Sequence, residues 1–269
     1  MSDTLTARVV PPPLVTGGGA ARLLERNFLV YRRIWIVIVS GFFEPIFYLF
    51  SIGVGIGALV GDVIGPGGNP VDYTAFVAPA LLAASAMNGA IFESTINIFF
   101  KLKYGKIYDA ILSTPMKTSD IAIGEIIWSL GRGLIYSAAF LLVMAVMGLV
   151  ESPWGILALP ASLLIGFAFA ACGMAATTYM NSWQDFDMVN LVVLPLFLFS
   201  ATFYPLDVYP ELFQVLTQLS PLYHGVQLIR ALTLGYFDIN LFGHVAYLLA
   251  MGAVGATIAS RRLEKLLLS

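Results

Sequence analysis

The sequence predicts an all-α membrane protein with six transmembrane helices, an N-terminal amphipathic interfacial helix, and a re-entrant helical hairpin before the sixth transmembrane helix. Apolar residues make up 59% of the 269 residues, charged residues only 11%, and the mean hydropathy is +0.86. Soluble domains average about 25% charged residues, so this chain has too few to cover a water-soluble globule. The apolar residues gather in six long stretches, and the basic residues gather between alternate stretches. These observations place the chain among polytopic membrane proteins.

Net charge and the reactive side chains exclude several other classes of function. The formal net charge of −2 argues against a nucleic-acid binder. The single cysteine, Cys172, excludes an intrachain disulfide and a cysteine metal site, and its apolar neighbours in the sequence favour a packing role. The two histidines, His224 and His244, are far apart in sequence and lack ligand-like spacing, so no metal site is expected.

The N-terminal region divides into a tail and an amphipathic helix. Residues 1–19 are rich in proline and glycine and lack the short apolar core of a signal peptide, so we expect a disordered cytoplasmic tail. Residues 20–33 carry arginine and leucine at helical spacing, which predicts an amphipathic helix with a basic face in the headgroup layer. This helix is either a simple juxtamembrane anchor or a contact site for a partner.

The six apolar stretches can each cross about 30 Å of hydrocarbon at about 1.5 Å per residue, although the fifth is barely long enough. The predicted spans are residues 34–61, 77–100, 121–150, 154–180, 188–204 and 240–260. The first span contains Glu44-Pro45, and the fifth contains Pro195. Residues 261–269 are expected to form a second cytoplasmic tail.

The distribution of lysine and arginine predicts the orientation of the bundle. Twelve of the fourteen basic residues lie before the first span, between the second and third spans, or after the sixth: Arg8, Arg22, Arg26, Arg32, Arg33, Lys101, Lys103, Lys106, Lys117, Arg261, Arg262 and Lys265. The opposite side carries mostly acidic residues, with Arg230 as its only cation, and Arg132 lies inside the third span. Because positively charged loops stay in the cytoplasm, both termini are expected there, in a protein that crosses the bacterial plasma (inner) membrane several times.

The segment 205–238 does not read as a simple loop. Apolar residues recur at helical spacing on both sides of Pro221, and each piece is far too short to span a membrane. Two short apolar helices that start and end on the outer side predict a re-entrant hairpin in the outer leaflet, covered by protein or by a water-lined cavity. The alternative is an amphipathic lid that lies on the outer surface.

Three sequence runs carry a resemblance to a known family. They are GFFEPIFYLFSIGVGIG in the first span, AFVAPALLAASAMNGAIFES in the second, and FLFSATFYPLDVYPELFQVLTQLSPLYHGVQLIRALTLG from the fifth span through the hairpin. The chain resembles the type-2 ABC exporter permeases and is most similar to the branch that includes the NodJ lipo-oligosaccharide export permeases. The resemblance covers nearly all of residues 20–260. It implies a six-helix half-transporter, in which two identical or related permease subunits pair with two cytoplasmic ATPase subunits that bind ATP and Mg²⁺.

The chain carries no phosphate-binding motif of its own. The only Gly-Lys pair is Gly105-Lys106, and the residue five positions before Gly105 is Phe100, where an ATP-binding P-loop needs glycine. We therefore expect a non-catalytic subunit that binds no cofactor and depends on ATP hydrolysis by a separate chain.

The polar loop 101–120 is the expected docking surface for the ATPase. A short helix parallel to the membrane is predicted here, because apolar residues follow the lysines and Thr114-Pro115 ends the run. The residues assigned to ATPase coupling are Lys101, Lys103, Lys106, Asp109, Ile111 and Leu112. The alternative is a solvated basic loop that serves only the topology.

Three ionisable residues fall inside the first three spans at a similar depth. Glu44, Glu93 and Arg132 each lie about 10–17 Å from the cytoplasmic boundary, at about 1.5 Å per residue. Charges inside a membrane are costly and usually pair, so we predict an ion-pair cluster with Arg132 between the two carboxylates. Contact with polar groups of a substrate, and a solvated cavity without pairing, are the alternatives.

Small and aromatic residues indicate a subunit interface and a substrate path. Gly53, Gly55, Gly57 and Gly61 form two overlapping G-x-x-x-G patterns. The resemblance favours packing against a second permease subunit there, and packing within the chain is the equal alternative. A route between two copies would be lined from the first, second and fifth spans, with the aromatic candidates Phe43, Phe47, Tyr48, Phe197, Phe199, Phe203 and Tyr204. Most aromatic residues in such a chain face lipid or fill the core.

The sequence therefore predicts the membrane subunit of an ABC exporter that moves an amphiphile outward. By analogy with NodJ-like permeases, a glycolipid or lipid-linked saccharide is the first candidate cargo, and a hydrophobic drug or antibiotic is the second. A secondary transporter or channel is the alternative from another class, but the sequence lacks the mid-membrane ion-binding network and internal repeats expected there. A membrane enzyme would need paired carboxylates, a nucleophile or metal ligands gathered at one membrane face, and the sequence shows no such set.

Overall fold

The computed structural model describes residues 18–31, 43 and 46–268. Within these ranges, four helices are long and apolar enough to cross a membrane: Tyr73–Tyr104, Thr118–Val146, Pro153–Thr177 and Asn240–Leu267. Ile46–Val60 is a shorter apolar helix from the first predicted span. The earlier part of that span, with Glu44, lies outside the described residues, as do residues 1–17 of the predicted tail.

Helices make up most of the described chain, and two short strands form a hairpin, with Val63 opposite Val71. The elements in chain order are α1 (Gly19–Tyr31), η1 (Leu49–Ile56), α3 (Gly57–Val60), β1 (Asp62–Ile64), η2 (Pro66–Gly68), β2 (Pro70–Asp72), α4 (Tyr73–Phe92), η3 (Glu93–Asn97), η4 (Phe100–Tyr104), α5 (Ile107–Leu112), α6 (Thr118–Val146), η5 (Pro153–Leu157), α7 (Ala158–Thr177), η6 (Trp183–Asp185), α8 (Phe186–Leu198), η7 (Leu206–Val208), α9 (Glu211–Leu219), α10 (Pro221–Leu234) and α11 (Asn240–Leu268).

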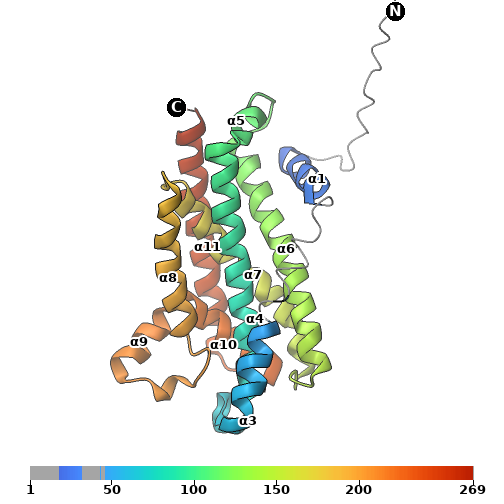
Figure 1. Ribbon diagram of the computed structural model, residues 1–269, viewed down its shortest axis with the longest axis vertical. Coiled ribbons are helices and arrows are strands. Elements are labelled where there is room, and N and C mark those ends of the chain that lie inside the picture. The colour runs from blue at the N-terminus through green and yellow to red at the C-terminus, as the bar shows by residue number, and fades with distance from the viewer. Residues whose placement is uncertain (1–17, 32–42, 44–45, 269) are drawn as a thin grey trace, which may run out of the picture.

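The long helices run side by side as one bundle (Figure 1). α7 packs against α4, α6 and α11, and α10 packs against α4, α7 and α11. Small and aliphatic side chains fill the main core, including Ala80, Ala83, Ile165 and Val226, which are fully buried. One end of the bundle holds α1, α5 and the carboxyl end of α11, and the opposite end holds α3 and α9. We call these the α5 end and the α3 end.

Glycine permits the close approach of α11 to α7. A Cβ atom at Gly255 would lie 2.8 Å from the backbone nitrogen of Cys172, and one at Gly252 would lie 2.3 Å from the ring of Phe167. A larger residue at Gly255 would therefore push two helix backbones apart. Cys172 is half-buried at this helix contact.

α4 begins earlier than the predicted second span, at Tyr73 rather than Val77. The Asp72 carboxylate caps the helix by accepting a hydrogen bond from the backbone N–H of Thr74 at 3.1 Å. The helix continues through η3 and η4 to the polar loop, with a π-helical segment that begins at Glu93. Such π-helical turns often occur where functional residues lie, and Glu93 is one of the predicted buried charges.

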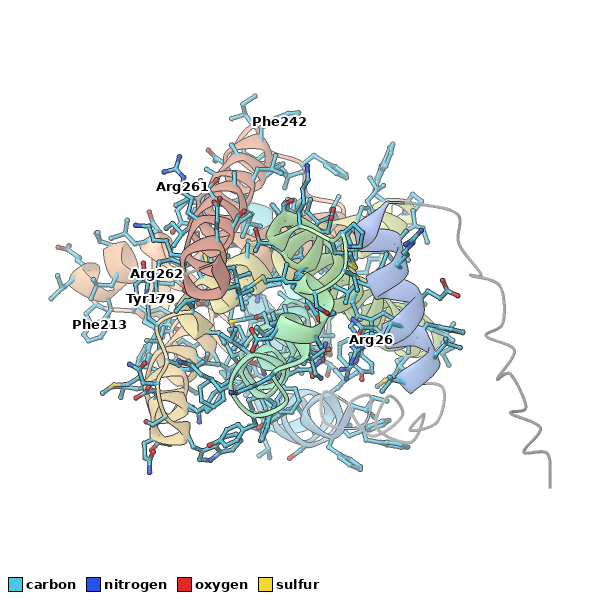
Figure 2. The ribbon with its side chains drawn as sticks, turned by 90° about the horizontal axis from the view of Figure 1, so that it is seen from above. Arg26, Tyr179, Phe213, Phe242, Arg261 and Arg262 are labelled. Carbon is cyan, nitrogen blue, oxygen red and sulfur yellow. The ribbon has the colours of Figure 1, made fainter. Side chains whose placement is uncertain are left out.

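α8 and α11 also differ in length from the predicted spans. α8 has 13 residues, begins two residues before the predicted fifth span and ends at Leu198, so residues 199–204 of that span are not helical. α11 continues to Leu268, so the described part of the segment assigned to a tail is helical. Its Arg262 guanidinium lies over the Tyr179 ring, 4.1 Å from the centroid, and Figure 2 shows these two side chains in a view from above the bundle.

α9 and α10 are two short helices that meet at Ser220 and Pro221, within the predicted hairpin segment. They differ in burial. α9 leaves its apolar side chains exposed, including Leu212 and Leu216, while most of α10 is buried against the long helices. The pair therefore has one helix inside the bundle and one on its surface.

The location of Arg230 differs from the predicted one. Charge counting assigns it to the outer-side loops, but the residue is almost fully buried in α10. Its guanidinium donates hydrogen bonds to the backbone carbonyls of Phe76 (3.1 Å) and Ala201 (2.9 Å), and it lies over the Phe76 ring, 3.7 Å from the centroid. The carbonyl oxygens and the ring face replace the water that a buried cation loses. Arg230 thereby joins α10 to α4 and to the turn that follows α8.

Candidate functional site

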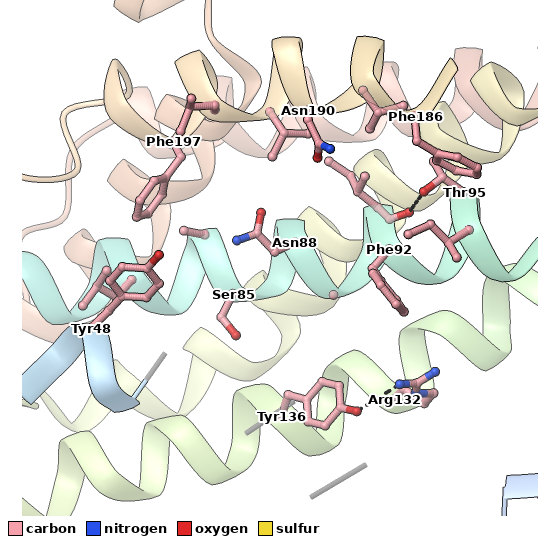
Figure 3. Close-up of a pocket in the computed structure, with 18 residues that line it drawn as sticks. Tyr48, Ser85, Asn88, Phe92, Thr95, Arg132, Tyr136, Phe186, Asn190 and Phe197 are labelled. Carbon is pink, nitrogen blue, oxygen red and sulfur yellow. Dashed lines mark hydrogen bonds between the residues drawn. The ribbon is translucent and has the colours of Figure 1, made fainter. Parts of the chain in front are cut away.

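A cavity of about 670 Å³ lies beside α4, between the helix of the first span, α6 and α8 (Figure 3). Its wall is mostly apolar and includes the aromatic rings of Tyr48, Phe92 and Phe197. Polar side chains interrupt this wall: Ser85, Asn88, Thr95, Arg132, Tyr136 and Asn190. Sites that bind small molecules have volumes of about 300–1,000 Å³ and walls of this mixed character, so the cavity is a candidate binding site.

Arg132 and Glu93 form an ion pair at the wall of this cavity. Both side chains are buried and have further partners, since Arg132 Nη2 donates to the Tyr136 hydroxyl at 3.0 Å and the Asn97 amide donates to Glu93. These contacts offset the water that the two charges lose inside the bundle. The structure thus brings together two of the three predicted intramembrane charges. The third, Glu44, lies outside the described residues.

A second buried ion pair joins Lys101 to Glu125 at 2.8 Å, closer to the α5 end. Glu125 of α6 also accepts hydrogen bonds from the Tyr108 hydroxyl of α5 (3.2 Å) and from the Asn27 amide of α1 (3.4 Å). Burial, and next the Glu125 carboxylate, raise the pKa of Tyr108 well above its ordinary value. One carboxylate of α6 therefore ties together α1, η4, α5 and α6.

The position of Lys101 corrects its assignment to an exposed docking loop. The residue lies in η4, in the helical extension of the second span, and its side chain is buried. The other residues assigned to ATPase coupling are accessible: Lys103, Lys106 and Asp109 are exposed, and Ile111 and Leu112 are half-buried. α5 itself has only six residues and begins after Lys106, whose backbone φ is +44°.

Comparison with known proteins shows the family. The family model described as ABC-2 type transporter matches residues 20–234. The chain belongs to the ABC-2 type transporter family. It is 33% identical to nodulation protein J of Rhizobium leguminosarum bv. trifolii over 226 residues, which cover 83% of this chain and 84% of the relative. It is 27% identical to the inner membrane transport permease YadH of Escherichia coli, over 78% of this chain and 81% of the relative. The protein is therefore a membrane permease of the ABC-2 type.

Three of the aromatic residues predicted to line a substrate path lie at or beside the cavity of this ABC-2 permease. Tyr48 and Phe197 line it, with their ring centroids 5.8 Å apart. Phe203 packs against Phe197 with ring centroids 5.2 Å apart, and it is not itself a lining residue. The lining rings come from the first and fifth spans, so both spans contribute to the wall beside α4.

The remaining aromatic candidates lie elsewhere in the permease. Phe43 and Phe47 stack on each other and are exposed. Phe199 lines a separate apolar hollow of about 440 Å³ between α8 and α9. Tyr204 packs on Tyr209 in the turn region after α8, with ring centroids 4.8 Å apart. The structure therefore does not place these four predicted residues at the cavity.

Gly53 and Gly57 pack within the permease chain. A Cβ atom at Gly53 would lie 3.0 Å from the Thr74 methyl group, and one at Gly57 would lie 2.9 Å from the Thr74 hydroxyl oxygen. That hydroxyl donates a hydrogen bond to the Gly53 carbonyl at 3.0 Å. These contacts favour the intrachain alternative over the predicted dimer packing. Gly61 ends α3 with a φ of +71°, which favours glycine, and a Cβ there would meet nothing within 4 Å.

Sequence reasoning missed Glu125, although the spacing of the charges carried a signal. Lys101 follows Glu93 by eight residues, and Glu125 precedes Arg132 by seven. Each helix therefore carries opposite charges about two turns apart. In two antiparallel helices this spacing aligns both ion pairs at once, which is the arrangement that the permease shows.

Sequence reasoning also missed the contact between His224 of α10 and His244 of α11. Their Nδ1 atoms lie 2.7 Å apart, and Tyr247 stacks on His224 with ring centroids 4.0 Å apart. The two histidines are distant in sequence but meet because α10 packs against α11. In the part of the permease that the structure describes, no three potential metal ligands gather.

Proposed function

We propose that this permease is the transmembrane subunit of an ATP-driven exporter that moves an amphiphile outward across the bacterial inner membrane. The observation that carries the proposal is the family match over residues 20–234, which includes α1, α5, the cavity wall and the hairpin. The proposed cargo is a glycolipid or lipid-linked saccharide. This choice is supported by the similarity to nodulation protein J and by a cavity wall that combines aromatic rings with polar side chains.

The proposed assembly contains two permease copies and two ATPase subunits that bind ATP and Mg²⁺. Each copy crosses the membrane six times, with the hairpin of α9 and α10 re-entrant from the outer side. The α5 end faces the cytoplasm, which the exposed cations Lys103, Lys106 and Arg261 at this end support. The cavity lies beside the first, second and fifth spans, where a second copy would complete its wall.

The proposed coupling route runs from α5 to the cavity through the two buried ion pairs. Tyr108 of α5 donates to Glu125, which holds Lys101 in the same helical run as Glu93. About two turns further from the α5 end, Glu93 pairs with Arg132 at the cavity wall. In this proposal a displacement of α5 by the ATPase moves α4 and α6 together, because networks of ion pairs and hydrogen bonds between rigid helices carry energetic coupling.

Reconstitution tests the proposal. The permease is co-expressed with the ATPase of the neighbouring reading frame and placed in proteoliposomes with a fluorescent acylated oligosaccharide. We expect ATP-dependent transport of this probe only when both subunits are present, and no ATP hydrolysis by the permease alone, because the sequence has no P-loop.

A variant of the ATPase that lacks its P-loop lysine serves as the control and should abolish transport without changing assembly. Nucleotide hydrolysis by the purified permease, or transport driven by an ion gradient without the ATPase, would refute the proposal. ATP-driven transport of a hydrophobic drug but not of the glycolipid would keep the exporter and replace its cargo.

A further inference from the structure

Two amide side chains occupy opposite walls of the cavity. Asn88 lies on α4 and Asn190 lies on α8, and Figure 3 shows both amides pointing into the space between these helices. Ser85 precedes Asn88 by three residues, so it lies on the same face of α4, and it also lines the cavity. The three residues form a polar zone between the ring pair Tyr48–Phe197 and the ion pair of Arg132.

These three polar side chains have no hydrogen-bond partner within the part of the chain that the structure describes. The structure gives neither amide, nor the Ser85 hydroxyl, a hydrogen bond to any residue that it describes. The other polar groups nearby are engaged, since Arg132 and Tyr136 are bonded to each other. Asn88 and Ser85 are half-buried and Asn190 is exposed, so their polar atoms are open to the cavity and are not covered by protein. The amides are therefore available to a ligand.

The electrostatics of the cavity select the kind of ligand. Among the described residues that line the cavity, Arg132 is the charged one, and it is paired with Glu93. A charged ligand would lose water here without gaining a free counter-ion. An uncharged hydroxyl or amide group would not meet this difficulty, because each asparagine offers two N–H donors and one carbonyl acceptor.

We propose that Asn88, Asn190 and Ser85 bind the uncharged, hydroxyl-rich head of the transported amphiphile, such as a neutral oligosaccharide. The apolar wall beside these residues receives the less polar faces of the same head or the start of the acyl chain. The inference rests on the proposed function and extends it, because it assigns the recognition of the head to three side chains and requires the head to be neutral.

Binding to the permease–ATPase complex in nanodiscs, without ATP, tests this site independently of transport. The probes are a fluorescent acyl chain linked to a neutral oligosaccharide and the same molecule with every hydroxyl O-methylated. We expect the wild-type complex to prefer the free hydroxyls. Asn88→Leu and Asn190→Leu should each reduce that preference by about three- to ten-fold, which corresponds to one or two lost neutral hydrogen bonds.

Val193→Ala is the matched control. Val193 lines the cavity from α8, on the same face as Asn190, and carries no hydrogen-bonding group. We expect this variant to weaken both probes equally and to keep the preference. Asn88→Leu combined with Asn190→Leu should abolish the preference while the complex remains assembled.

Three outcomes would overturn the inference. The first is a wild-type complex that binds the two probes equally, and the second is a double variant that keeps the preference. The third is separation of the two permease copies by the asparagine variants, which would place the amides at the subunit interface.

Preferential binding without any ATP-driven transport would support the site and refute the proposed function. Transport by a double variant with unchanged preference would support the function and refute the site.

Discussion

Replacing Arg132 by leucine will destabilise the permease by about 3–5 kcal/mol, the usual effect of breaking a buried ion pair. The substitution removes the cation that pairs with Glu93 and the donor to the Tyr136 hydroxyl. Glu93 is only 4% exposed, so water cannot take the place of the guanidinium. Denaturant unfolding of the purified permease in detergent measures the loss.

The double variant Arg132→Leu with Glu93→Gln separates charge pairing from side-chain packing. We expect it to be more stable than Arg132→Leu alone, because a neutral amide needs no counter-ion. Arg261→Leu is the control, since Arg261 is exposed on α11 and its loss should change the free energy of unfolding by less than about 0.5 kcal/mol. An Arg132→Leu variant as stable and active as the parent would show that the ion pair does not stabilise the packing of the helices that carry Arg132 and Glu93.

Replacing Glu125 by leucine will destabilise the α5 end by about 3–5 kcal/mol and will uncouple ATP hydrolysis from transport. The substitution leaves Lys101 buried without its carboxylate, and it removes the acceptor shared by Tyr108 and Asn27. α1 and α5 then lose their common attachment to the third span. Faster hydrogen exchange in α1 and α5, and fewer molecules transported per ATP hydrolysed, are the expected observations.

The double variant Lys101→Met with Glu125→Leu distinguishes stability from coupling. An apolar pair of similar volume should restore most of the stability, while transport per ATP should stay low, because the link from Tyr108 to the third span is still missing. Lys265→Met, which removes an exposed cation of α11 that is not assigned to ATPase coupling, is the control and should leave both readouts unchanged. Parental coupling in the double variant would mean that Glu125 serves only the stability of the fold.

The sequence predicts the helices well where hydropathy alone defines them. Apolar runs place α6 and α7 within a few residues of their observed bounds. The start of α4 depends instead on the cap made by Asp72, and the end of α8 depends on the turn that follows Leu198. Hydropathy is a property of a window of residues, so it does not detect a boundary that one side chain or one turn decides.

The candidate site was only partly predictable, for a related reason. The similar depth of Glu93 and Arg132 below the cytoplasmic boundary was enough to predict that the two side chains could form an ion pair. Asn88 and Asn190 are about 100 residues apart, and no local pattern shows that their helices border one cavity. The burial of Arg230 likewise depends on how α10 folds back into the bundle, and that is a property of tertiary packing.

Labelling of single cysteines tests most directly the central claim that the α5 end faces the cytoplasm, where an ATPase supplies the energy. In a Cys172→Ala background, Lys106→Cys places a thiol in the exposed turn before α5, and Ile239→Cys places one just before α11, at the opposite end. With a membrane-impermeant maleimide, we expect Ile239→Cys to react in spheroplasts and Lys106→Cys to react only in inverted vesicles. Reaction of Lys106→Cys in intact spheroplasts would contradict the account, because no cytoplasmic ATPase could then reach α5.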